Sequence, residues 1–486
     1  MNPLDANNDN TLYQALRSRD RRFDGAFFVG VTSTGIYCRP VCPSRTPLRK
    51  NCRFFVIAAA AQDAGFRACL RCRPELAPAV HRAAESGVAS QLVALLRQAA
   101  LEGGSMEEVA QQSGWSVRQL SRKLAEECGT TPGSIMRTER LLFAKRLLHE
   151  TDLSMTEVAL RSGFRSVRRF NAEFAEKSGM TPGAIREKRM GKVTPGSLRL
   201  RLDYRPPYAW SEMLGWLRAR ATRGVEVVSD DAWTRAVRVG GHEGWLQVSQ
   251  DSLHDCLIVE LSSNLTVSLP QLVRRLRSLF DLDANPAEML PLFENDPLLG
   301  QVADRYPGLR IPGAWDLFET AVRTVIGQQV TVAAATTVAG RLAARLGERC
   351  ASNPHGLEFH AVTPAALAVA TVDELAALGM PGKRALALQT LARHAMDGGL
   401  EILPFATLEE VSRSLTELPG IGPWTADYIA MRALRHPDAF PAGDIALRKA
   451  LGDGIAISQA AAETVSQRWR PWRAYAAALL WQLPKN

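Results

Sequence analysis

The chain has 486 residues, of which 46% are hydrophobic and 22% are charged, and its formal net charge is +9. This composition is that of a folded globular protein and excludes a mini-protein, a fibrous repeat and a mainly disordered chain. No apolar stretch approaches the roughly 20 residues that span a bilayer, and residues 1–20 show no secretion signal. We therefore expect a cytoplasmic protein without a membrane partner, built from about three folding units.

The positive charge is concentrated in the first part of the chain. Residues 1–200 hold 31 Lys and Arg against 19 Asp and Glu, whereas residues 201–486 hold 28 against 31. The net charges of the two parts are therefore +12 and −3. Because phosphate neutralisation supplies most non-specific nucleic-acid affinity, the first part is expected to bind DNA or RNA. A basic face that only keeps the protein soluble is the alternative.

Five of the eight cysteines fall within residues 38–72, around a strand candidate at residues 54–57. Cys38 with Cys42 and Cys69 with Cys72 form two close pairs, the spacing at which four thiolates close a tetrahedral zinc site. One zinc ion per chain is expected. The alternative to a reactive zinc site is a structural zinc site that only stabilises the fold of a small domain. Five neighbouring arginines could hold a phosphate beside the thiolates: Arg39, Arg45, Arg67, Arg71 and Arg73.

The segments TGIYCRPVC (residues 34–42) and AGFRACLRC (residues 64–72) closely resemble the N-terminal zinc domain of the Ada family, over roughly residues 10–80. The resemblance implies that Cys38 takes a methyl group irreversibly from a methylphosphotriester in DNA. It also implies that Thr34, Arg45 and Arg67 contact the DNA backbone. The chemistry is reasonable, since metal binding keeps a sulfur deprotonated and methylation turns it into a neutral thioether.

Residues from about 88 to 190 are helical in pattern and contain an internal repeat with an offset of 49 to 50 residues. Each repeat reads helix, Ser-Gly turn, helix, which is typical of a helix-turn-helix unit whose second helix enters the major groove. Two such units resemble the DNA-binding domain of the AraC family. A basic repeat that packs on a partner protein is the alternative. The expected DNA-facing side chains of the second helices are Arg118, Gln119, Arg122, Lys123, Arg165, Arg168, Arg169 and Asn171.

A linker is expected at residues 191–196, and the rest of the chain begins with strand candidates at 198–202, 235–239 and 257–261 before turning helical after about residue 269. Its sharpest motif is LPGIGPWTA (residues 418–426), which reads helix, Gly-x-Gly hairpin, helix. Gly420 and Gly422 allow a tight turn whose N–H groups can face a phosphate. Asp444 follows 22 positions after Gly422.

The hairpin and the aspartate together resemble the helix-hairpin-helix superfamily of DNA glycosylases and, over about residues 200–486, its AlkA branch. The resemblance implies that Asp444 is the catalytic carboxylate, which stabilises positive charge on the sugar as the bond to an extruded base breaks. Gly420, Gly422 and Thr425 would bind DNA. The resemblance also implies a pocket for the base with aromatic walls formed by Trp216, Trp424, Tyr428 and Trp481. For any single one of these residues, packing in the core is the alternative.

Some positions depart from the AlkA pattern. Polar Gln329 stands where AlkA has an apolar wedge into the duplex, and Ile445 and Gln482 replace tyrosines of the pocket. The lyase branch of the superfamily has lysine where Trp424 stands, so a glycosylase without strand cleavage is expected. No Pro-Cys-His-Arg stretch occurs in the sequence, so direct repair of O6-methylguanine is not expected.

We therefore predict a multidomain chain, mainly α with α+β parts, that resembles an Ada-AlkA fusion. The expected parts are a small zinc-bound α/β domain (1–85), an all-α double helix-turn-helix domain (86–192), an α+β glycosylase subdomain (197–310) and an all-α helix-hairpin-helix core (311–486). The resemblance implies a protein that senses methylation damage, excises bases such as 3-methyladenine and activates transcription on promoter DNA. We expect a monomer, with RNA polymerase as a partner if the protein is an activator. One alternative is a regulator with a catalytically silent glycosylase-like module, and another is a repair enzyme that the first two modules only localise on DNA.

Overall fold

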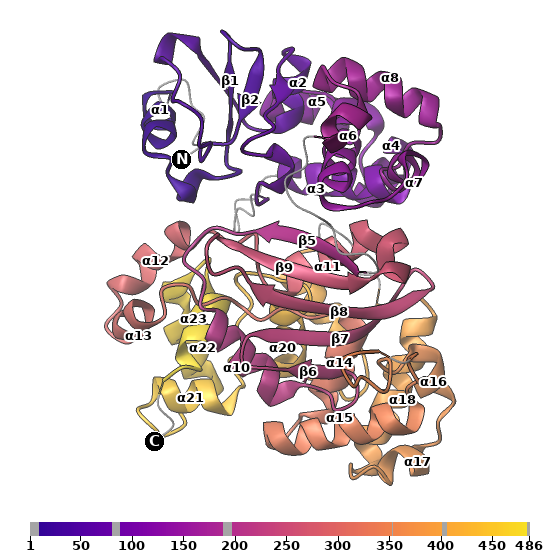
Figure 1. The fold of residues 1–486 in the computed structure, drawn as a ribbon. Helices are drawn as coiled ribbons and strands as arrows, with labels where there is room; N and C mark the ends of the chain where they lie inside the picture. Colours follow the sequence, from indigo (N-terminus) through magenta and orange to yellow (C-terminus); the bar gives the residue numbers. More distant parts are fainter. Residues whose placement is uncertain (1–8, 80–87, 188–196, 352, 401–405, 484–486) are drawn as a thin grey trace. The chain divides into compact units, whose positions relative to one another are not determined.

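The structure is a computed structural model that describes residues 9–79, 88–187, 197–351, 353–400 and 406–483. The chain divides into two compact units (Figure 1): Met1–Pro206 with Leu253–Leu257, and Pro207–Ser252 with Ile258–Asn486. Both contain helices and strands, which confirms the predicted mainly α chain with α+β parts. The expected linker at 191–196 lies outside the described residues. Across the described ranges, no helix is long and apolar enough to cross a membrane.

The first unit begins with α1 (Asp9–Ser18) and a four-stranded mixed sheet of order β3-β1-β2-β4. β1 (Phe28–Val31) pairs antiparallel with β2 (Ile36–Cys38) and β3 (Cys52–Phe55), and β4 (Arg67–Ala68) runs parallel to β2. The strand expected at 54–57 is β3, which lies two residues earlier and is followed by α2 (Ala58–Asp63). Because β2 ends at Cys38 and β4 leads into Cys69, the parallel pairing brings the two cysteine pairs together.

The helices that follow reproduce the sequence repeat. Capping boxes of Ser105 with Glu108 and of Ser154 with Glu157 begin the first helix of each repeat. Gly163, in the second Ser-Gly turn, has φ +78°, and a Cβ there would lie 2.3 Å from the Ala100 carbonyl oxygen, so this turn requires glycine. β5 (Ser197–Asp203) is the last element of this stretch. The helices are α3 (Val88–Glu102), α4 (Met106–Ser113), α5 (Val117–Cys128), α6 (Pro132–Glu150), α7 (Met155–Arg161), α8 (Val167–Ser178) and α9 (Pro182–Glu187).

The second unit combines a sheet of order β9-β8-β7-β6 with a helical body. The strands are β6 (Glu226–Val228), β7 (Ala232–Val239), β8 (His242–Gln250) and β9 (Cys256–Ser262), of which β6 and β8 were not expected from the sequence. α10 (Trp210–Arg220) precedes them, and α11 (Leu269–Leu279) begins the helical body at the expected residue.

One apolar core joins the helices of this body. Val325, Leu388, Ile429 and Ala476 come from four different helices and are all fully buried. Such close packing fixes the hairpin before α20 and the N-terminus of α21. The helices are α12 (Pro286–Glu294), α13 (Gly300–Arg305), α14 (Leu317–Ile326), α15 (Val332–Leu346), α16 (Pro364–Val369), α17 (Val372–Ala376), α18 (Gly382–Met396), α19 (Leu408–Thr416), α20 (Pro423–Arg432), α21 (Ile445–Leu451), α22 (Gln459–Ser466) and α23 (Arg473–Leu480).

Candidate functional sites

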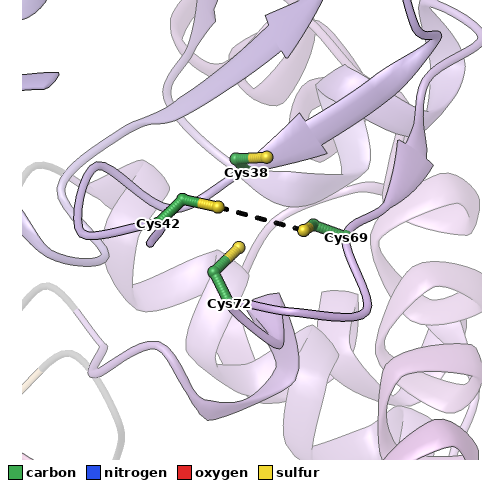
Figure 2. Close-up of side chains that lie close together, drawn as sticks. All are labelled: Cys38, Cys42, Cys69 and Cys72. Atoms are coloured by element: carbon green, nitrogen blue, oxygen red, sulfur yellow. Dashed lines mark hydrogen bonds between the residues drawn. The ribbon is translucent and has the colours of Figure 1, made fainter. Parts of the chain in front are cut away.

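Four buried cysteines of the first unit converge on one point. Figure 2 shows the sulfurs of Cys38, Cys42, Cys69 and Cys72 facing one another, and all four lie within 4.8 Å of each other. The Cys42 and Cys69 sulfurs are 4.0 Å apart. A tetrahedral zinc ion with Zn–S bonds near 2.3 Å separates its sulfurs by roughly 3.8 Å. The cluster therefore fits one zinc ion, as the sequence predicted.

The thiols also perturb one another. Through its hydrogen bonds, the Cys38 thiol lowers the pKa of Cys42, and it lowers the pKa of Cys69 to about 6. The hydrogen bonds to Cys42 and Cys69 raise the pKa of Cys38, and burial raises the pKa of Cys72. The Arg39 backbone N–H donates to the Cys72 sulfur at 3.3 Å and stabilises the thiolate form of Cys72. A bound zinc ion would supply the positive charge that keeps all four sulfurs in the thiolate form.

The arginines around the cluster fall into two groups. Arg39 is 5% exposed and is paired with Asp24, and Arg73 is paired with Glu75 at 3.0 Å and Glu150 at 2.7 Å. The expectation that Arg39 and Arg73 hold a phosphate is therefore corrected, because buried carboxylates already neutralise their charge. The side chains that stay exposed are Thr34, Arg45, Arg67 and Arg71.

The second helices of the repeat, α5 and α8, present basic side chains to solvent. Four of the expected side chains have partners within their own helices. The Gln119 amide oxygen accepts the Ser116 backbone N–H at 2.9 Å, and Lys123 is paired with Glu127. Arg122 is paired with Glu126, and Arg169 with Glu173. These contacts stabilise the helices before any DNA is bound. The expected side chains that are exposed, besides Gln119, are Arg118, Arg122, Arg165, Arg168, Arg169 and Asn171.

In the second unit, the hairpin before α20 is tied to the loop after α14. Gly420 has φ +86°, and the Gln328 side-chain amide donates to its carbonyl oxygen at 2.7 Å and to the Thr425 hydroxyl at 3.1 Å. Thr425 is only 2% exposed, so its side chain is internal and its backbone N–H is the group that the first turn of α20 can offer to DNA. Gly422 and Gln329 are exposed, and Gln329 has φ +56° at the tip of its loop.

Asp444 lies in a pocket of about 1880 Å³ within this unit. Its Oδ1 accepts the backbone N–H groups of Ala446 at 2.9 Å and Leu447 at 3.0 Å, so Asp444 is the N-cap of α21. The Trp481 indole N–H lies 3.5 Å from the same oxygen. Because these donors of the described chain all meet Oδ1, Oδ2 is the oxygen that can face a ligand in the pocket.

Aromatic side chains form the pocket walls. Trp424 and Tyr428 are stacked, with centroids 5.7 Å apart and planes 29° apart, and Trp216 and Trp481 lie 5.1 Å apart at 34°. The structure thus brings all four expected aromatic residues to the pocket that holds Asp444. Flat walls at these spacings suit a planar ring as ligand. Gln329, Ile445 and Gln482 line the same pocket.

Arginines that were not expected from the sequence also line this pocket, and two of them contact its aromatic walls. The Arg220 Cζ lies 3.4 Å from the Trp216 ring centroid, and Arg432 donates to the Tyr428 hydroxyl at 2.6 Å. In each case the arginine follows the aromatic residue by four positions in one helix. That i, i+4 spacing was the available signal, because such residues are neighbours on a helix surface.

Four family models match successive parts of the chain. They describe the metal-binding domain of Ada (residues 11–75), a helix-turn-helix domain (109–188), the AlkA N-terminal domain (199–316) and the HhH-GPD superfamily base excision DNA repair protein (322–474).

Relatives match both the whole chain and its parts. A probable bifunctional transcriptional activator/DNA repair enzyme AlkA of Mycobacterium tuberculosis is 37% identical over 96% of this chain and 95% of its own length. DNA-3-methyladenine glycosylase 2 of Escherichia coli is also 37% identical, over 58% of this chain and 95% of its own. A solved 3-methyladenine DNA-glycosylase from Archaeoglobus fulgidus shares the fold, with a TM-score of 0.51 and 23% identity over 58% of this chain and 96% of that chain.

Proposed function

The chain belongs to the Ada-AlkA family of bifunctional transcriptional activators and DNA repair enzymes, and from this premise we propose that it accepts methyl groups from damaged DNA and excises alkylated bases. The observation that carries the proposal is the position of Asp444. It is a half-buried carboxylate fixed by a helix N-terminus in a pocket with aromatic walls. This arrangement argues against the catalytically silent alternative, because a binding module has no need of a carboxylate there.

In the glycosylase reaction, an extruded damaged base stacks against Trp424 and Tyr428. The Oδ2 atom of Asp444 faces the sugar and stabilises the positive charge that develops as the N-glycosidic bond breaks. Water then completes the hydrolysis. Since Trp424 offers no amine, no Schiff base forms with the sugar, and the activity is that of a monofunctional glycosylase acting on bases such as 3-methyladenine.

In the methyl-transfer reaction, the Cys38 sulfur attacks the methyl carbon of a DNA methylphosphotriester. A sulfur–carbon bond forms, the carbon–oxygen bond breaks, and the phosphate oxygen leaves as an ordinary phosphodiester anion. A zinc ion held by the four cysteines supplies the positive charge that keeps their sulfurs deprotonated. Cys38 is assigned as the acceptor from the match of its segment to the metal-binding domain of Ada, and Thr34, Arg45 and Arg67 bind the neighbouring phosphates. Each chain reacts once, because the thioether is not reversed.

As a regulator, the protein binds promoter DNA through α5 and α8, with Arg118 and Arg168 among the side chains that read the groove. In this proposal the protein is a monomer and acts on RNA polymerase at the promoter. The four proposed domains are residues 1–85, 86–192, 197–310 and 311–486. A repair enzyme that is only localised by its first two modules would bind all duplexes alike, so preference for one promoter in a binding assay separates the two readings.

Mass spectrometry of the protein tests the methyl-acceptor proposal. A duplex with a single methylphosphotriester should add one methyl group to the peptide that contains Cys38, and Cys38→Ser should abolish the addition. Cys52 is buried in the same core outside the two pairs, so Cys52→Ser is the matched control and should retain uptake. Methyl on another cysteine would reject Cys38 as the acceptor.

A further inference from the structure

The base pocket contains a guanidinium group that the glycosylase mechanism does not use. Arg220 is the last residue of α10, one turn after Trp216, and its Cζ lies 3.4 Å from the Trp216 ring centroid. Both residues line the pocket that holds Asp444. The Trp216 ring therefore already interacts with one cation, and it is less available to attract a second cation in a bound base.

No carboxylate neutralises Arg220 within the part of the chain that the structure describes. Two of the charged groups near Arg220 are themselves cations, Arg432 and Arg323. The Arg220 side chain donates to the Trp216 carbonyl oxygen at 3.5 Å. Burial lowers the pKa of Arg220 to about 10, so the group stays charged at neutral pH.

The other arginines of the pocket are held by ion pairs or hydrogen bonds to neighbouring residues. Arg235 is paired with two glutamates. Arg432 donates to two backbone carbonyl oxygens besides its tyrosine partner, and Arg323 donates to two backbone carbonyl oxygens and a threonine hydroxyl. A guanidinium has five N–H donors, and among the described residues the hydrogen bond of the Arg220 side chain is the one to the Trp216 carbonyl oxygen. Arg220 is therefore the pocket arginine with the fewest hydrogen bonds and the most donors left for a ligand.

We propose that Arg220 determines base specificity, favouring damaged bases that are neutral and carry a hydrogen-bond acceptor over bases that are cations. It repels a purine alkylated at N3 or N7, which carries a positive charge, and it donates to a carbonyl oxygen of a neutral base. Cationic bases are still released, because their charge makes them good leaving groups. The inference rests on the proposed glycosylase function and defines the substrate class of the same pocket.

Two variants of one helix test the proposal. Arg220→Met keeps the length and the apolar stem of the side chain but removes its charge and donors. Arg218→Met is the matched control, because Arg218 lies outside the pocket and donates to the Ser229 carbonyl oxygen at 2.7 Å. Single-turnover release of hypoxanthine, a neutral base, and of 7-methylguanine, a cation, is measured from otherwise identical duplexes.

In Arg220→Met, the ratio of hypoxanthine release to 7-methylguanine release should fall by about 10-fold, the effect of one hydrogen bond to a charged group. Arg218→Met should leave the ratio unchanged, and Arg220→Lys should retain most of it. An equal loss for both bases, or a ratio unchanged in Arg220→Met, would overturn the proposal and leave Arg220 with a packing role. Release of neither base by the wild-type chain would instead refute the proposed glycosylase function.

Discussion

Replacing Asp444 by asparagine separates the two roles that the structure gives this carboxylate. Its Oδ1 caps α21 through the N–H groups of Ala446 and Leu447, whereas Oδ2 accepts no hydrogen bond from the residues that the structure describes. The asparagine side-chain oxygen can take the place of Oδ1, and asparagine is as good an N-cap as aspartate. The substitution therefore keeps the cap and removes the negative charge.

The expected magnitudes differ for two substitutions at this position. Asp444→Asn should change the free energy of unfolding by only a few tenths of a kcal/mol, yet lower base release by at least two orders of magnitude, about 3 kcal/mol in transition-state stabilisation. Asp444→Ala loses the cap as well, so it should lose activity equally and destabilise the second unit by about 1 kcal/mol.

Release of 3-methyladenine from duplex DNA under single-turnover conditions measures the chemical role, and denaturant unfolding measures the cap. Methyl uptake by Cys38 is the internal control, because it belongs to the first unit and should be unchanged in both variants. If Asp444→Asn released 3-methyladenine at near the wild-type rate, the assignment of the catalytic carboxylate would be wrong.

Three further predictions concern the remaining sites. Because Trp424 supplies no amine, borohydride should trap no covalent adduct with DNA, and a trapped adduct would show that another amine attacks the sugar. Methylation of Cys38 removes one negative charge beside bound phosphate, so the methylated protein should bind DNA more tightly than the unmodified protein, by a margin that shrinks as the salt concentration is raised. Equal affinities of the two forms over a salt series would show that Cys38 methylation does not act as a sensor. Lys145 is 3% exposed and donates to the Cys69 carbonyl oxygen and to Glu75, so it stabilises the first unit. Lys145→Met should therefore lower the free energy of unfolding of this unit by about 3 kcal/mol, and a loss below 1 kcal/mol would contradict this role.

The carboxylate partner of Lys145 also predicts a pH dependence. Burial alone would raise the pKa of Glu75, but the charges of Lys145 and Arg73 lower it from 4.5 to about 2. Its contribution to stability is therefore complete above about pH 4.5 and is lost as the pH falls toward 2. Unfolding measured over this range should show a weaker pH dependence in Lys145→Met than in the wild-type chain.

The zinc site could be predicted from spacing alone, because two close cysteine pairs at this spacing are typical of a tetrahedral site of four thiolates. The repeat likewise predicted the helices and turns around Gly114 and Gly163, since the amphipathic pattern and the turn glycines agree locally. Asp444 is different. Nothing in its local pattern marks it as a catalyst, and only the resemblance to a glycosylase family pointed to it.

The features that could not be predicted from the sequence depend on residues that are far apart in the chain. Arg39 and Arg73 resemble phosphate-binding arginines until the fold brings Asp24 and Glu150 to them. β2 and β4, of three and two residues, are too short for an alternating pattern to appear. Thr425 has the sequence position of a DNA contact, but its hydroxyl is used by Gln328, 97 residues earlier in the chain.

One chain is expected to carry two chemistries: a methyl acceptor that is consumed when it reacts, and a glycosylase that turns over many times. Incubation with an excess of methylated duplex DNA, followed at the same time for free modified base and for methyl bound to protein, tests it most directly. Bound methyl should stop at one per chain on Cys38, while released base should continue to rise far beyond the amount of protein. Base release that also stops after one event per chain, or methyl uptake that is absent while base release proceeds, would contradict it.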